Sequence, residues 1–263
     1  MTNIRFSLFT IFLLLAGCVH KPPGQAYPSR IFLLQSQAAP PKAQSLSKEA
    51  EEFLLTLESY LQLQPPPGAL LRIYHYRWRW SLWYYLLQTA PSFCWRPAVC
   101  FETNEAYHIA ISGRPESKRF HKNLHHELTH YLLTAHYSYL PPWLDEGLAQ
   151  IMSFGPPFPH LPPEILSVIK GVLETQYHDS CIKVALYPPT EMMNVSEYYL
   201  ACALTYYLLK SEKEGINRFH RYLKHIHPQG ELPHIFSEEL GISIDEACKN
   251  LGPFYQTFNY ESH

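Results

Sequence analysis

The strongest constraint in this sequence is the stretch from Ser117 to Leu140, which contains neither glycine nor proline. Apolar side chains recur through it at three- and four-residue spacing, which places them on one face of an α-helix. They are Phe120, Leu124, Leu128, Tyr131, Leu132 and Ala135. A helix with one apolar face must bury that face, so the pattern predicts a central helix against which the rest of the fold packs.

The same stretch contains the sequence His126-Glu127-Leu128-Thr129-His130. Histidines four residues apart are just over one helical turn apart, so both imidazoles project from one face, about 6 Å apart along the axis. There they can bind one metal ion, and neutral imidazole nitrogens suit Zn²⁺. Glu127 is rotated off the ligand direction and can accept a proton from water at the metal. We predict His126 and His130 as zinc ligands and Glu127 as general base.

A second motif, WLDEGLA at 143–149, follows Pro141 and Pro142, which suit the first turn of a new helix. Together the two motifs resemble those of the gluzincin metallopeptidases, the clan of thermolysin and aminopeptidase N, and most closely its small peptidase-MA-like domains. The resemblance is strong over residues 107–153. It implies a zincin-like fold, Glu146 as the third zinc ligand, and a peptide or protein substrate.

Other histidines near the motif have weaker claims as ligands. His136 has the spacing of the last histidine in the metzincin pattern HExxHxxGxxH, but Leu133 stands where that pattern needs a glycine hinge. We therefore expect Glu146 to be the third ligand. His121 and His125 lie on a face rotated from His126, and we interpret them as structural or supporting residues. Asp145 has two open roles: it can orient a zinc-bound histidine, or it can favour the dipole of its helix.

Peptide hydrolysis also needs a donor for the oxyanion of the tetrahedral intermediate. Related enzymes often use a tyrosine or histidine from a later helix, and the resemblance makes Tyr198 and Tyr199 the candidates here, both at the start of an expected helix. The resemblance also implies that the strand from Tyr107 to Ile111 is a sheet edge that binds an extended peptide.

The first residues form a sorting signal. Residues 1–17 carry one basic residue, Arg5, before an apolar stretch too short for a permanent membrane span, which indicates a signal peptide. The sequence LAGC that ends at Cys18 resembles the bacterial lipobox, which implies that Cys18 is acylated and anchors the mature chain to a membrane. Val19 follows in place of Asp, which by the same resemblance favours the outer membrane, facing the periplasm.

Residues 18–46 are rich in proline, glutamine, alanine and serine and predict an extended tether. Ile31, Phe32, Leu33 and Leu34 depart from that composition and predict either an edge strand or a patch that packs on the domain. Residues 47–263 then form one peptidase-like domain. Its expected helices cover 47–63, 81–88, 117–140, 143–153, 163–173, 196–210, 215–225 and 243–251, and its expected strands cover 70–76, 98–101 and 107–111.

Composition excludes one class of partner. The chain has 21 Lys and Arg against 23 Asp and Glu, a net charge of -2, with no long run of either sign, so we expect no nucleic-acid partner. After Cys18 five cysteines remain, an odd number for an oxidising compartment. They are Cys94, Cys100, Cys181, Cys202 and Cys248. Their pairing is open, with a small loop between Cys94 and Cys100 as our first hypothesis.

These patterns predict an α+β protein: a small mixed sheet followed by a mainly helical, zincin-like part, with the active-site helix at the junction. The expected function is that of an envelope-anchored zinc metallopeptidase. The alternative is a zinc-containing lipoprotein that binds peptides or assists assembly without catalysis. A chance HExxH sequence in a structural lipoprotein would bind no zinc.

Overall fold

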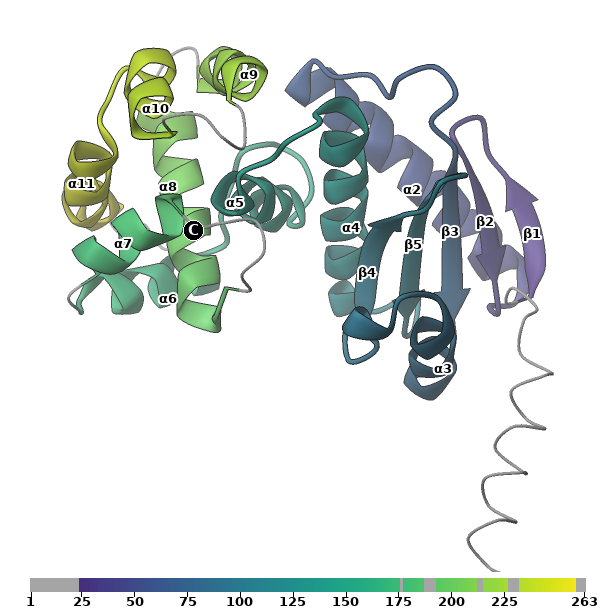
Figure 1. The fold of residues 1–263 in the computed structure, drawn as a ribbon. Helices are drawn as coiled ribbons and strands as arrows, with labels where there is room; N and C mark the ends of the chain where they lie inside the picture. Colours follow the sequence, from purple (N-terminus) through teal and green to yellow (C-terminus); the bar gives the residue numbers. More distant parts are fainter. Residues whose placement is uncertain (1–23, 176, 187–192, 212–214, 227–231, 259–263) are drawn as a thin grey trace, which may run out of the picture. The chain divides into compact units, whose positions relative to one another are not determined.

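The computed structural model describes residues 24–175, 177–186, 193–211, 215–226 and 232–258. They form a mixed α+β fold with a five-stranded sheet near the N-terminus and ten α-helices (Figure 1). The strands are β1 (Gln25–Pro28), β2 (Phe32–Ser36), β3 (Leu71–Tyr76), β4 (Ala98–Glu102) and β5 (Tyr107–Ser112). The helices are α2 (Pro40–Leu61), α3 (Arg79–Thr89), α4 (Lys118–His136), α5 (Pro142–Met152), α6 (Pro163–Leu173), α7 (His178–Ala185), α8 (Val195–Ser211), α9 (Gly215–His225), α10 (Leu232–Leu240) and α11 (Ile244–Gln256).

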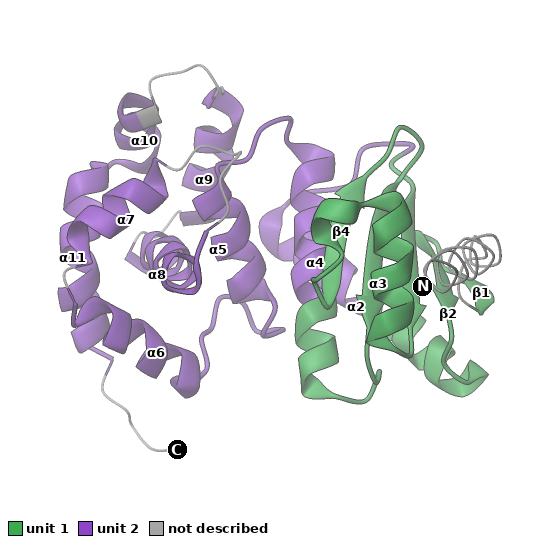
Figure 2. Ribbon diagram, turned by 60° about the horizontal axis from the view of Figure 1, so that its bottom comes forward, with its two compact units in different colours: residues 1–51, 69–124 green, residues 52–68, 125–263 purple. Residues whose placement is uncertain are grey.

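The chain divides into two compact units (Figure 2). Unit 1 comprises residues 1–51 and 69–124 and contains the sheet. Unit 2 comprises residues 52–68 and 125–263 and is helical. Helices α2 and α4 each pass from one unit to the other. None of the helices in the described part of the chain is long and apolar enough to span a membrane.

The sheet of unit 1 has the strand order β1-β2-β3-β5-β4. The inner strands β2, β3 and β5 are parallel, and the two edge strands are antiparallel to their neighbours. Alternate residues of β3 face opposite sides of the sheet. Tyr74 and Tyr76 pack against Tyr85 of α3 on one side, and His75 packs against Phe120 of α4 on the other. The sheet is therefore covered on both faces, as parallel strands require.

The predicted tether at 18–46 is wrong from residue 24 onward. β1 and β2 form a hairpin in that segment, and α2 begins at Pro40 instead of Ser47. The apolar patch becomes β2, in which Phe32, Leu34 and Ser36 are buried at alternate positions. Prolines at 40 and 41 suit the first turn of a helix, because that turn has no backbone acceptor for their missing N–H groups. A proline-rich composition therefore concealed regular structure.

Within unit 2, a disulfide joins Cys181 of α7 to Cys248 of α11. The hypothesis of a loop closed by Cys94 and Cys100 is wrong, since both remain thiols. The side chain of Cys94 packs in the cluster between α3 and the sheet, on the same side as Val99. Cys100, the next residue on β4, points to the opposite face. The two sulfurs are thus separated by the sheet itself.

Candidate metal centre

The second half of α4, which belongs to unit 2, carries both histidines of the HExxH sequence. Their Nε2 atoms are 3.0 Å apart, and their ring centroids are 4.6 Å apart with the planes almost perpendicular. Both side chains are mostly buried, with 20% of His126 and 12% of His130 exposed. The helical spacing therefore brings two imidazole nitrogens to one point, as the sequence predicts.

Glu146 of α5 completes the cluster. Its Oε2 lies 3.4 Å from Nε2 of His126 and 3.6 Å from Nε2 of His130. Tetrahedral zinc with bonds of about 2.0–2.1 Å separates its ligand atoms by about 3.3 Å, so the three donors have nearly the spacing of a zinc site. His126, His130 and Glu146 thus form a possible metal-binding triad within the described residues.

Gly147, the next residue of the WLDEGLA motif, allows α5 to approach α8. A Cβ atom at this position would lie 2.7 Å from the backbone oxygen of Ala201 and 2.1 Å from Oγ1 of Thr205. Both contacts are shorter than real Cβ contacts, and the backbone oxygen cannot move aside easily. The motif therefore needs glycine for helix packing, which fixes where Glu146 lies along α8.

Asp145 contacts the cluster through the second ring nitrogen of His130. Its Oδ1 accepts a hydrogen bond of 2.8 Å from Nδ1 of His130. This bond places the proton of the neutral imidazole on Nδ1 and leaves the Nε2 lone pair free to bind a metal. Asp145 also lies in the first turn of α5, where the helix dipole favours a carboxylate. Both roles left open by the sequence are consistent with its position.

The electrostatics of the cluster favour positive charge. Burial by itself would lower the pKa of His130, but the charge of Asp145 and hydrogen bonds to Asp145 and Glu146 outweigh burial and raise that pKa well above its usual value. Burial opposes ionisation of Glu146 too, yet hydrogen bonds from His126 and His130 hold its pKa far below the usual range. A buried, ionised carboxylate that faces two imidazoles is a donor set suited to a divalent cation, whose positive charge balances that of the carboxylate.

Glu127, the expected general base, lies next to His126 on α4 and is 8% exposed. A carboxylate this deeply buried is unusual unless it has a specific partner or role. Its position beside the triad agrees with the expected one, while its part in catalysis stays a prediction.

Tyr198 of α8 contacts the cluster, since its hydroxyl donates a hydrogen bond of 3.3 Å to Oε1 of Glu146. Tyr199 is half-buried on the same helix and, in the described part of the chain, makes no hydrogen bond to the triad. The structure therefore separates two candidates that the sequence left equal.

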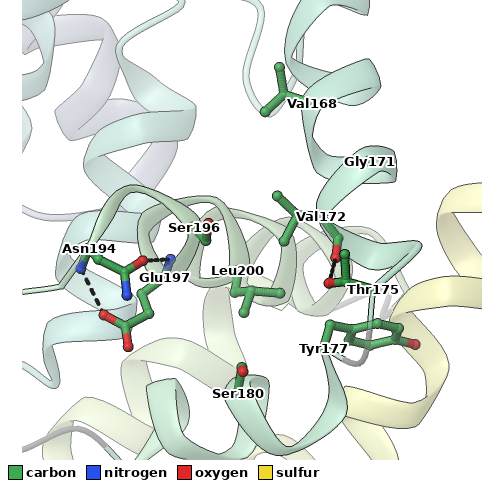
Figure 3. Close-up of a pocket in the computed structure, with 10 residues that line it drawn as sticks. All are labelled: Val168, Gly171, Val172, Thr175, Tyr177, Ser180, Asn194, Ser196, Glu197 and Leu200. Carbon is green, nitrogen blue, oxygen red and sulfur yellow. Dashed lines mark hydrogen bonds between the residues drawn. The ribbon is translucent and has the colours of Figure 1, made fainter.

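The start of α8 is fixed by a reciprocal cap that the sequence analysis missed. Oδ1 of Asn194 accepts from the backbone N–H of Glu197, and Oε2 of Glu197 accepts from the backbone N–H of Asn194 (Figure 3). The N-x-x-E spacing is the signal that could have revealed this capping box. Tyr198 lies in the first turn of α8, so the cap that fixes this turn also helps to position Tyr198.

A cavity of about 400 Å³ lies beside this cap (Figure 3). It is lined from α8 by Ser196, Glu197 and Leu200. At 3.6 residues per turn, Tyr198 points roughly to the opposite side of the helix. The cavity is therefore separate from the metal centre, and we assign it no role in the chemistry there.

The remaining histidines of α4 do not join the triad. His121 pairs with Glu49 in unit 1, and His125 stacks on Phe53 with ring centroids 3.9 Å apart. His136 is exposed at the end of α4 beside Tyr137, so the metzincin alternative has no support. Leu133 stays in regular helix, without the hinge that this alternative needs.

The expected peptide-binding edge is wrong. The predicted strand 107–111 corresponds to β5, which is hydrogen-bonded to β3 on one side and to β4 on the other. Neither edge of β5 can accept a peptide strand. Within the described sheet, the edge strands are β1 and β4. The family resemblance implied an edge at this strand, but the antiparallel pairing with β4 covers it.

Comparison with known proteins adds no assignment. No protein-family model matches the chain, and no curated protein matches it at a significant level.

Proposed function

We propose that this protein is a zinc-dependent metallopeptidase held at the bacterial envelope by a lipid on Cys18. The observation that supports it most is the convergence of His126, His130 and Glu146 from two helices on one point. Two imidazole nitrogens and one carboxylate are the ligand set of gluzincin sites, which the two sequence motifs resemble. The hydrogen bond that Nδ1 of His130 donates to Asp145 adds to that likeness.

The residues of the chain divide the chemistry among them. Zinc held by the triad would act as a Lewis acid toward a peptide carbonyl and make water acidic enough to lose a proton near neutral pH. Glu127 accepts that proton and passes it to the leaving amine. The hydroxyl of Tyr198 borders the triad, so we assign to it the hydrogen bond to the carbonyl oxygen that gains negative charge.

The decisive test compares Glu127→Gln with the full-length protein, purified in detergent. We expect about one zinc ion per chain in both. Because the amide cannot accept the proton, peptide cleavage should fall by about 10²- to 10⁴-fold. Glu164→Gln is the matched control, since Glu164 is exposed in the first turn of α6.

Three results are informative. Unchanged cleavage in Glu127→Gln with zinc retained would remove Glu127 from the mechanism. Zinc without cleavage of any member of a broad peptide library would favour the non-catalytic, peptide-binding alternative. A protein that retains no zinc would refute both functions.

A further inference from the structure

One end of the sheet in unit 1 carries exposed tryptophans and arginines. The segment 77–97 joins the end of β3 to the start of β4 and contains four of the five tryptophans of the chain, three arginines, and no aspartate or glutamate. Trp78, Trp80 and Trp95 are 52%, 69% and 74% exposed. We call these three residues, with Arg77, Arg79 and Arg96, the tryptophan–arginine end. Exposed tryptophans gathered in this way usually mark an interaction surface.

The arginines of this end are held by aromatic rings and backbone. The guanidinium of Arg77 lies over the Trp78 ring at 5.0 Å, and that of Arg96 lies over the Phe93 ring at 5.7 Å. Arg79 donates a hydrogen bond of 2.7 Å to the backbone oxygen of Trp95. Within the described residues, no ion pair joins these three arginines to a carboxylate. Their charges are therefore available to an anionic partner.

A cavity of about 680 Å³ adjoins the tryptophan–arginine end. Arg77, Arg114 and Lys42 line it, together with Glu116, which forms an ion pair with Lys42. The cavity lies where β3 and β5 end and where α4 begins, so the positive end of the α4 dipole adds to the cationic side chains. The charge of this region favours phosphate or other anionic groups.

The strand register places the N-terminal entry of the chain at the same end of the sheet. Gln25 of β1 pairs with Ser36, Ser36 pairs with His75, and Arg77 follows two residues later. Neighbouring strands are about 4.8 Å apart, so β1 begins about 10 Å from the end of β3. Figure 1 shows the start of β1 and α3 at one end of the sheet.

The distance from the proposed anchor to this point is short. Gly24, where the described fold begins, is six positions after Cys18, and six residue steps span at most about 20 Å in any conformation. A lipid on Cys18 would therefore keep this end of unit 1 within about 20 Å of the bilayer. The tether of 18–46 that the sequence suggested would have allowed a far greater distance.

We propose that the tryptophan–arginine end of unit 1 rests on an anionic phospholipid surface. The exposed indole rings lie at the level of the headgroups, where tryptophan is favoured because it is apolar at one end and polar at the other. The arginines and the cavity bind lipid phosphates. This inference depends on the lipid anchor of the proposed function and adds an orientation to it.

Tryptophan fluorescence in vesicles tests this orientation, because bromine atoms on lipid acyl chains quench nearby indoles. The full-length lipoprotein is reconstituted in brominated phosphatidylcholine with about three parts in ten of phosphatidylglycerol. The background variant replaces Trp78, Trp80 and Trp95 with phenylalanine, which keeps apolar area. One reporter restores Trp80. The control reporter is Leu70→Trp in the same background, because Leu70 is 58% exposed at the opposite end of β3, about 20 Å away.

We expect quenching of Trp80 to exceed that of the position-70 reporter by about threefold or more, because only the first lies at the headgroups. Without phosphatidylglycerol, or at about 0.5 M salt, the difference should shrink, since screening weakens arginine–phosphate attraction. Equal quenching of the two reporters, or none at Trp80, would overturn the proposal and leave a protein partner as the occupant.

Flotation of the same vesicles separates this outcome from failure of the anchor. A protein that floats with the vesicles but shows no preferential quenching has an anchor without the proposed orientation. If the protein does not float, even with all tryptophans intact, it lacks the lipid anchor. The proposed orientation is then refuted, because it depends on that anchor. Zinc content and peptide cleavage, measured on the same sample, report on the metal centre independently.

Discussion

Buried histidines have opposite surroundings in the two units. In unit 1, His75 on β3 is bonded to Ser36 Oγ and to the backbone oxygen of Gly113, and burial lowers its pKa. In unit 2, the side chain of His130 is also mostly buried, yet two carboxylates face it and its pKa rises. Burial pushes both pKa values down, so the carboxylates account for the difference. In this comparison, the histidine that carboxylates face is the one that belongs to the candidate metal centre.

The contrast extends to what each histidine can bind. Both nitrogens of His75 are occupied by neutral hydrogen-bonding groups, which fits a structural role. In His130, Nδ1 is occupied by Asp145, and Nε2 points at His126 and Glu146. The buried triad of unit 2 can therefore bind a cation. In unit 1, by contrast, the buried His75 is neutral and the arginines of the tryptophan–arginine end are on the surface.

After Glu127→Gln, the largest effect should come from the tyrosine that borders the triad. Tyr198→Phe removes the hydroxyl that bonds Glu146, and we expect kcat to fall by about 10²- to 10³-fold, as when an oxyanion donor is lost. Zinc affinity should change much less. Tyr199→Phe is the matched control and should keep nearly full activity. An equal loss in both variants would show that α8 contributes only packing, and Tyr198 would lose its assigned role.

Removing a supporting carboxylate should have a smaller effect. Asp145→Asn keeps the shape of the side chain but removes its charge, so His130 loses the anion that orients it. We expect zinc affinity to fall by about 10- to 100-fold, measured by competition with a chelator. The exposed Glu164→Gln variant again provides the baseline. If Asp145→Asn bound zinc as tightly as the parent, the carboxylate would serve only the helix dipole.

A third change tests whether helix packing positions the triad. Gly147→Ala would place a methyl group 2.7 Å from the backbone oxygen of Ala201. The helices must separate, which should destabilise the protein by about 1–3 kcal/mol. Gly171→Ala on α6 is a close control because nothing lies within 4 Å of its Cβ position. Gly171→Ala should stabilise the protein by about 0.5–1 kcal/mol, since alanine has a higher helix propensity than glycine.

Urea unfolding of the two alanine variants gives the comparison directly. Gly147→Ala should also lose zinc affinity, because Glu146 moves with α5. If both variants were equally stable, the close approach of α5 and α8 would not be what fixes Glu146.

Local patterns predicted the triad better than they predicted its surroundings. Helical spacing alone brings His126 and His130 together, and the WLDEGLA motif identified Glu146 on the next helix. The hydrogen bond that His130 donates to Asp145 could not be predicted, because it depends on how α5 rotates against α4. The disulfide joins cysteines 67 residues apart, and no local pattern reports a contact at that separation.

The N-terminal segment shows a different limit of sequence analysis. Its prolines indicated an extended tether, but Pro40 and Pro41 occupy a helix start, and β1 with β2 is stabilised by pairing with β3. Strand propensity depends on the neighbouring strands, so a short edge hairpin leaves little signal of its own. The error at β5 has another source, since the resemblance implied an edge there and could not report that β4 pairs with this strand.

The smallest effect should be a loss of stability of unit 1 in mild acid. The folded pKa of His75 lies below the value of about 6.5 in the unfolded chain, because burial outweighs the Gly113 bond and the charge of Glu116. Protonation therefore favours unfolding. The stabilising contribution of neutral His75 is complete above pH 6.5 and is lost as the pH falls below it. Tryptophan fluorescence in urea reports this loss, since four of the five tryptophans lie in unit 1.

His75→Gln should flatten this pH dependence, because glutamine can bond Ser36 and Gly113 without titrating. His234→Gln is the control, since His234 is exposed beside Glu238, and it should leave the dependence unchanged. His108 is also buried in unit 1 with a lowered pKa, so part of the slope should remain in His75→Gln. A slope unaffected by His75→Gln would mean that the neutral interior of unit 1 does not depend on this histidine, and the contrast with His130 would then fail.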